Sequence, residues 1–159
     1  MAKSLSGMGL PLAVTLIKPQ HDIWKPAEHN GTFRGNNHAF ITAAAAIEKF
    51  WADDSFAKTV AGKAAYLADR LGAIAESHDL SVKGRGMMLG VNAGSGEHAA
   101  AICKACFADG LIIETSGSFD EIVKILAPLT ISQEQLAAGL DTLEAAFESV
   151  MGRRRAAAE

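Results

Sequence analysis

The uneven spacing of strand-like segments constrains this fold more than any other feature of the sequence. A single apolar run, residues 12–17, comes before residue 79, and prolines bracket it at positions 11 and 19. The run predicts a short buried strand. One strand cannot form a sheet by itself, so we do not expect the first half of the chain to fold as a self-sufficient domain.

A long loop and two helices are predicted to follow this strand. Residues 18–35 are rich in Pro, His, Asn and Gly, and loops of such length are often functional. The alanine-rich stretch 37–51 predicts a helix, and Asp53 or Asp54 can cap a second helix that runs to about residue 78. Apolar residues recur every three or four positions in the second helix, which indicates one buried face.

The chain from residue 81 onward predicts a compact α/β unit, a sheet with helices on one face. Ser132 and Gln135 form a capping-box pattern at the start of the last helix, whose leucines and Phe147 make one apolar stripe. The other elements expected here are a glycine-interrupted strand over 81–92, a helix over 97–109 that ends at Gly110, and strands over 111–114 and 122–126.

Composition argues against several classes of function. The chain has 159 residues, of which 49% are hydrophobic and 21% charged, and its net charge is -3. This charge gives no reason to expect binding to nucleic acid or to an anionic membrane, and the apolar runs are too short to span a bilayer. The first twenty residues lack the features of a signal peptide. The two cysteines indicate a reducing, cytoplasmic environment and no structural disulfide.

Two motifs imitate known functional patterns without the context those patterns need. Cys103 and Cys106 have CxxC spacing, but no second ligand pair accompanies them, so we interpret them as small buried residues of a helix. The glycines of residues 84–90 nearly match a dinucleotide-binding fingerprint, but the third glycine is one residue late and no helix begins there. The five histidines lack metal-site spacing, and no metal site is predicted.

Lys3 and Thr32 are the two candidates for chemistry. Lys3 lies in a loop of small residues, and a lysine amine that loses its proton can attack a carbonyl, as it does in binding pyridoxal phosphate (PLP). Thr32 lies in a glycine-rich turn before a predicted helix, where a hydroxyl, backbone amides and the helix dipole can bind a phosphate. The alternatives are a solvated terminal lysine and a simple capping turn with Asn36 or Asn37 as N-cap.

Four motifs together resemble the class III PLP-dependent aminotransferases. They occur in the order of that family and cover nearly the whole chain, which argues against chance agreement. They are the lysine segment at 3–11, the Gly-Thr turn at 31–36, the small-domain strand at 82–90 and the final strand at 124–131.

The resemblance implies a fold and a division into domains. The fold class is α/β, the C-terminal part of a fold type I PLP-dependent transferase, with the end of the large domain and the small C-terminal α/β domain. Residues 1–78 would belong to the cofactor-binding large domain with the interdomain helix. Residues 79–152 would form the small domain, and residues 153–159 a tail.

The resemblance also implies roles for three residues. Lys3 would bind PLP covalently and, once the amino donor displaces it, would move a proton between substrate and cofactor. Thr32 would bind the cofactor phosphate of a neighbouring subunit, which implies a homodimer or a higher homo-oligomer. The family usually has an arginine at the position of Lys124 to hold the substrate carboxylate. Lysine is a point charge without the bidentate fork, so this departure puts the carboxylate role of Lys124 in doubt.

Within the family, residues 33–37 and the loop 24–26 favour one branch. This branch moves an amino group from L-glutamate to L-aspartate 4-semialdehyde and makes L-2,4-diaminobutyrate in ectoine biosynthesis, so its partners are amino acid and aldehyde substrates. An ornithine- or acetylornithine-type ω-aminotransferase is the alternative.

The length of the chain suggests a further alternative to an active enzyme. Family members are more than twice as long, and the upstream phosphate loop, the aromatic residue that stacks on the PLP ring and the aspartate at the ring nitrogen are missing here. The further alternative is therefore an inactive fragment that associates through exposed apolar surface. The helix at 37–51 would then lack part of its partner layer.

Overall fold

A computed structural model describes residues 3–6, 9–31 and 35–152. The chain forms two compact units, Met1–Ala57 and Lys58–Glu159, and each is treated by itself. The expected domain boundary after residue 78 stays a prediction. Among the described residues, no helix is both long enough and apolar enough to cross a membrane.

The first unit contains two short 3-10 helices, η1 (Lys3–Ser6) and η2 (Pro19–His21), and one α-helix, α1 (Asn37–Phe50). Helix α1 confirms the predicted helix. Its N-cap is Asn36, whose side chain accepts a hydrogen bond from the backbone N–H of Ala39 at 3.2 Å. Helix η1 packs against α1.

The strand predicted at residues 12–17 is wrong, because these residues are not part of any sheet. A strand exists only through pairing, and the described residues of the first unit supply no second strand. Helix α1 buries Ala39 and Ala43 but leaves Ile41 68% exposed. The first unit therefore shows the incomplete core that its sequence predicts.

Helix α2 (Ser55–His78) begins where Asp53 Oδ1 accepts the backbone N–H of Ser55 at 2.7 Å. A hydrogen bond from the side chain of Ser55, and after it this backbone hydrogen bond, lowers the pKa of Asp53. From Lys58 onward the helix belongs to the second unit, where it buries one apolar stripe, as the sequence predicts. The buried residues are Leu67, Leu71, Ile74 and Ala75.

A four-stranded antiparallel sheet forms the centre of the second unit, with strand order β1-β2-β4-β3. The single strand predicted over 81–92 is a hairpin of β1 (Ser81–Arg85) and β2 (Met88–Asn92). Gly86 has a φ of 63° at the first of the two turn residues, a conformation that favours glycine and suits hairpin turns. Gly86 therefore marks a chain reversal inside the predicted strand, whereas Gly84 and Gly90 lie within β1 and β2, where an added Cβ would meet the backbone of the facing strand.

The remaining strands are β3 (Glu114–Ser116) and β4 (Ile122–Leu126). Strand β4 confirms its prediction, whereas β3 starts three residues later than expected. The reason is the end of helix α3 (Gly96–Ala108), where the backbone N–H of Leu111 bonds to the carbonyl of Cys106 at 2.8 Å. Gly110 has a φ of 83° in this helix end, so residue 111 completes the cap of the helix.

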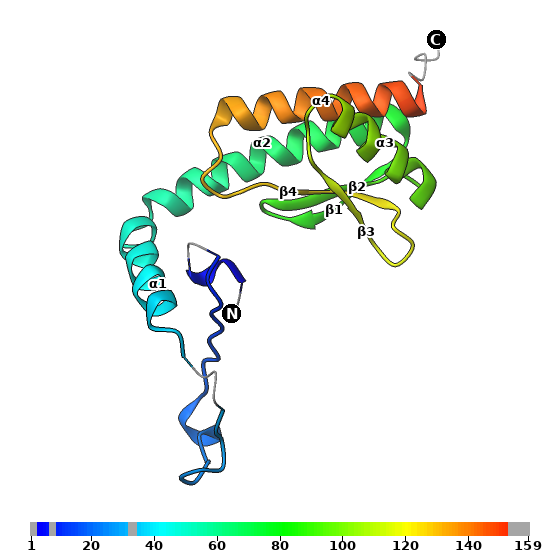
Figure 1. The fold of residues 1–159 in the computed structure, drawn as a ribbon. Coiled ribbons are helices and arrows are strands. Elements are labelled where there is room, and N and C mark those ends of the chain that lie inside the picture. Colours follow the sequence, from blue (N-terminus) through cyan, green and yellow to red (C-terminus); the bar gives the residue numbers. More distant parts are fainter. Residues whose placement is uncertain (1–2, 7–8, 32–34, 153–159) are drawn as a thin grey trace. The chain divides into compact units, whose positions relative to one another are not determined.

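Three helices cover one face of the sheet (Figure 1). Helix α4 (Gln133–Met151) has the predicted capping box, because Ser132 and Gln135 bond to each other's backbone. Arg70 of α2 lies 2.7 Å from Asp141 and 3.0 Å from Glu144 of α4, which holds these two helices side by side. The core between helices and sheet includes Val91, Val123, Ile102, Leu71, Leu140, Leu143 and Phe147.

Candidate functional site

Lys3 is the first residue of η1, the short helix that packs against α1. Three residues later, Ser6 is fully buried, and its Oγ has no hydrogen-bond partner within the part of the chain that the structure describes. A buried hydroxyl without a partner is costly. The prediction for Thr32 falls outside the described residues.

Helix α1 begins after Asn36, its N-cap. The side chain of Asn36 satisfies one first-turn amide, that of Ala39. The first turn of a helix has more unsatisfied N–H groups than one cap can fill, and its partial positive charge attracts anions. The predicted capping role of Asn36 is confirmed.

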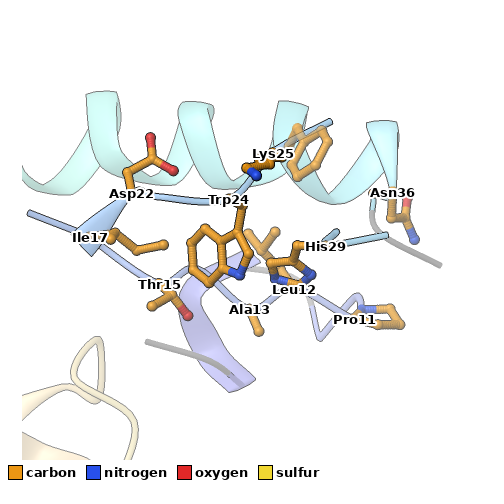
Figure 2. Close-up of a pocket in the computed structure, with 12 residues that line it drawn as sticks. Pro11, Leu12, Ala13, Thr15, Ile17, Asp22, Trp24, Lys25, His29 and Asn36 are labelled. Atoms are coloured by element: carbon orange, nitrogen blue, oxygen red, sulfur yellow. The ribbon is translucent and has the colours of Figure 1, made fainter. Parts of the chain in front are cut away.

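A cavity of about 730 Å³ lies in the first unit beside this helix start (Figure 2). Its walls are the extended segment 11–17, the loop that carries Trp24 and His29, and residues Asn36 and Phe40 of the α1 region. The rings of Trp24 and His29 lie 5.0 Å apart and tilted, next to each other in Figure 2. The cavity thus combines an aromatic wall with polar groups.

The amino-acid sequence does not predict this cavity. The length of loop 18–35 and the single tryptophan within it were the available signals. The cavity forms only where the loop folds back on residues 11–17, and local sequence patterns do not predict this folding.

Lys124, the third predicted site residue, lies on β4 in the second unit. Its Nζ donates a hydrogen bond to Oε1 of Glu114 at 2.6 Å. The two residues are directly opposite each other on β4 and β3. The hydrogen bond and the charge of Lys124 hold the pKa of Glu114 below its ordinary value. Lys124 is therefore paired, a feature that sequence reasoning missed because it depends on strand register.

The cysteines pack in the core of the second unit, which confirms their interpretation as buried helix residues. Cys106 is fully buried and Cys103 is half-buried, and both thiols are free. Burial raises the pKa of Cys106 to about 11, so its reactive thiolate is scarce at neutral pH. The glycines at 84–90 form a hairpin, so the rejection of a dinucleotide fingerprint is also confirmed.

Comparison with known proteins decides the family. The profile described as "Aminotransferase class-III" matches residues 1–147. The chain belongs to the class III aminotransferase family. The expected fold class is confirmed with it, because solved aminotransferases of this kind superpose on the chain.

Two curated class III relatives are similar over nearly the whole chain. The diaminobutyrate–2-oxoglutarate transaminase of Vibrio parahaemolyticus is 49% identical over 156 residues, which are 96% of this chain and 37% of that enzyme. The enzyme of the same name from Halomonas elongata is 51% identical over 148 residues, or 90% of this chain and 35% of that enzyme. The chain therefore spans little more than a third of the length of these relatives.

Among solved structures, the ornithine δ-aminotransferase of Plasmodium falciparum has a TM-score of 0.79 at 22% identity. The comparison covers 94% of this chain and 38% of that structure. The acetylornithine aminotransferase of Elizabethkingia anophelis has a TM-score of 0.74 at 23% identity, over 93% and 39% of the two chains. At these identities the likeness concerns the fold alone.

The residues of this class III chain fit the PLP that the family resemblance implies. Lys3 belongs to a short helix, and the buried hydroxyl of Ser6 has no hydrogen-bond partner among the described residues. Asn36 caps the N-terminus of a 14-residue helix, and a helix N-terminus suits a phosphate. An amine, a hydroxyl and a helix N-terminus together match an aldehyde cofactor that carries a phosphate.

Proposed function

We propose that this chain is part of a diaminobutyrate–2-oxoglutarate aminotransferase of ectoine biosynthesis. The reaction would transfer an amino group from L-glutamate to L-aspartate 4-semialdehyde and yield L-2,4-diaminobutyrate and 2-oxoglutarate. The observation that supports this most is the identity of 49% and 51% to two enzymes of that name over nearly the whole chain. The likeness to ornithine-type enzymes is much lower in identity.

Lys3 would carry the central chemistry. Its ε-amine would hold PLP and, once released, would take the proton from the substrate carbon that bears the amino group and later return it. This role requires the neutral amine, which a dry and apolar setting favours. When bound, PLP supplies an electron sink for the charge that develops on that carbon.

Thr32 and Lys124 would bind anionic groups. The hydroxyl of Thr32, together with the N-terminus of α1, would hold the cofactor phosphate of a neighbouring subunit. Lys124 would bind a substrate carboxylate as a single ammonium group, without the two parallel hydrogen bonds of arginine. These roles imply at least a homodimer. The two free thiols support a cytoplasmic location, where thiols stay reduced.

A chimeric enzyme tests this function. The chain replaces the matching segment of the Vibrio parahaemolyticus enzyme, and transamination is measured with L-glutamate and aspartate semialdehyde. We expect turnover, which Lys3→Ala lowers by about 100- to 10,000-fold, the range for loss of a general base. Lys18→Ala is the matched control, since Lys18 is exposed and lies outside the cavity walls.

Two results would contradict the proposal. The first is a Lys3→Ala chimera that keeps the wild-type rate. The second is a chimera that prefers ornithine or acetylornithine over 2,4-diaminobutyrate in the reverse direction, which would assign the chain to the alternative branch. The isolated chain serves as the background and is expected to show no transamination. Size-exclusion chromatography of the active chimera checks the predicted homo-oligomer.

A further inference from the structure

Asn30 and Gly31 form a dipeptide that differs from the setting of every other asparagine in the chain. The chain has four asparagines, and the residues that follow Asn36, Asn37 and Asn92 are Asn, His and Ala. Only Asn30 is followed by glycine. A Cβ shields the backbone nitrogen of its own residue, whereas glycine leaves that nitrogen open to close approach. The side chain of Asn30 therefore has an unshielded backbone nitrogen as its neighbour.

The side chain of Asn30 is folded over this nitrogen. The backbone N–H of Gly31 donates a hydrogen bond to Oδ1 of Asn30 at 2.8 Å. The bond brings the nitrogen of Gly31 next to Cγ, the side-chain carbonyl carbon that carries Oδ1. Both residues are exposed and lie outside every described helix and strand. Water can therefore reach both groups, and no ladder of backbone hydrogen bonds restrains them.

The loop before Asn30 is held by its own contacts. Lys25 and Glu28 close a turn, in which the N–H of Glu28 bonds to the carbonyl of Lys25 at 3.1 Å and Oε2 of Glu28 accepts the N–H of Lys25 at 2.8 Å. The ring of His29 lies 5.0 Å from that of Trp24. Because the residues before Asn30 are fixed in this way, a change in the backbone at Asn30 displaces the residues that follow it.

We propose that Asn30 is a site of spontaneous deamidation whose products weaken the binding of a phosphate at Thr32. The nitrogen of Gly31 attacks Cγ of Asn30, and the Cγ–Nδ2 bond breaks as the new N–Cγ bond forms. Nδ2 leaves as ammonia and takes with it the proton of the Gly31 amide. Water then opens the resulting cyclic imide at either of its two carbonyl carbons, which gives aspartate or isoaspartate. The reaction requires only this chain and water.

Both products change the chain just before Thr32. Each adds a carboxylate at position 30, and two residues span at most about 7 Å of chain. Repulsion between this charge and a phosphate is expected to weaken phosphate binding about three- to tenfold. Isoaspartate also routes the backbone through the side chain and so lengthens it by one carbon. This consequence rests on the proposed function, since it assumes that Thr32 holds the cofactor phosphate.

The competing interpretation is purely structural. Asparagine side chains often bond to nearby backbone groups in turns, and the bond would then stabilise the turn without leading to a reaction. The two interpretations predict different results for Gly31→Ala. A Cβ at position 31 covers the attacking nitrogen, so the substitution slows deamidation at Asn30 only if that nitrogen is the nucleophile.

The first experiment incubates the whole 159-residue chain in mildly alkaline buffer, which favours loss of the proton from the Gly31 amide. Peptide mass spectrometry follows the exchange of amide for acid at each asparagine. Asn92 is the internal control, because its Oδ1 also accepts a backbone N–H, that of Gly94 at 2.9 Å, but alanine follows it. Asn30 is expected to convert well before Asn92, and Gly31→Ala to slow its conversion. Conversion of Asn30 no faster than that of Asn92, or unchanged in Gly31→Ala, would overturn the inference.

The second experiment separates this inference from the proposed function. In the chimera, Asn30→Asp introduces the charge directly, and Asn30→Ser is the uncharged control. Fluorescence titration with PLP is expected to show about three- to tenfold weaker binding in Asn30→Asp and wild-type binding in Asn30→Ser. Equal PLP affinity of the two variants in an active chimera refutes the effect on phosphate binding and leaves the function standing. An inactive but folded chimera counts against the function, while mass spectrometry of the chain still decides whether Asn30 reacts.

Discussion

Gly90→Ala is the perturbation whose effect follows most directly from the structure. A Cβ at this position would lie 2.5 Å from Cγ2 of Ile122 and 2.7 Å from the carbonyl oxygen of Val123. The side chain can turn aside, but the carbonyl belongs to the backbone of β4, which pairs with β2. We therefore expect a loss of about 1–3 kcal/mol in the free energy of unfolding, as for other overpacked cores.

The chain offers a matched control in Gly72 of α2. A Cβ there meets nothing within 4 Å, and alanine is favoured over glycine inside a helix by about 0.5–1 kcal/mol. The same Gly→Ala change is therefore expected to stabilise the second unit at position 72 and to destabilise it at position 90. Changes of opposite sign in the free energy of unfolding would exclude a general effect of alanine on the unfolded chain.

Urea unfolding followed by far-UV circular dichroism measures both effects. The two tryptophans, Trp24 and Trp51, lie in the first unit, so their fluorescence reports on that unit separately. We expect Gly90→Ala to lower the midpoint of the circular dichroism transition at an unchanged slope. A Gly90→Ala chain as stable as the wild type would refute the reasoning, since it would mean that β2 and β4 separate freely to admit a methyl group.

Two further predictions concern titratable groups of the second unit. Burial raises the pKa of both thiols, that of Cys106 to about 11, and Cys103 is the more exposed of the two. Iodoacetamide at about pH 8 is therefore expected to alkylate Cys103 well before Cys106; equal rates of alkylation by peptide mass spectrometry would contradict this. Lys124→Met is expected to raise the pKa of Glu114 toward its ordinary value of 4.5, as measured by NMR titration. Because the pKa of Glu114 is lowered in the folded chain, its carboxylate stabilises the fold above about pH 4.5. This stabilisation is lost as the pH falls through the lowered pKa of the folded chain. The Lys124→Met chain should therefore lose less stability on acidification. A pKa of Glu114 that does not change in this variant would rule out Lys124 as the cause.

Local signals predicted the elements that depend on neighbouring residues. The capping box at Ser132 and Gln135, the helix end at Gly110 and the apolar stripe of α4 each lie within a few turns of chain, and all are confirmed. The strand at 12–17 is wrong because strand formation depends on a partner elsewhere. The single glycine-interrupted strand predicted over 81–92 is a hairpin because glycine is typical both of interrupted strands and of two-residue turns.

The same distinction between local patterns and long-range contacts applies to the candidate site. Lys3, Thr32 and Lys124 could be predicted because each belongs to a motif of consecutive residues, and their roles stay predictions. Glu114 was missed because it meets Lys124 across ten residues of sequence, through the register of two strands. The aromatic wall of Trp24 and His29 was missed for a similar reason, since it forms only when the loop folds over residues 11–17.

The order of the sheet has a consequence for self-association. Its two outer strands are β1, which carries Lys83 and Arg85, and β3, which has only three residues. Short or charged edges discourage another strand from adding to the sheet. Aggregation by strand addition is therefore disfavoured in the second unit, and any contact that a second molecule makes with this sheet has to use the side chains of its open face.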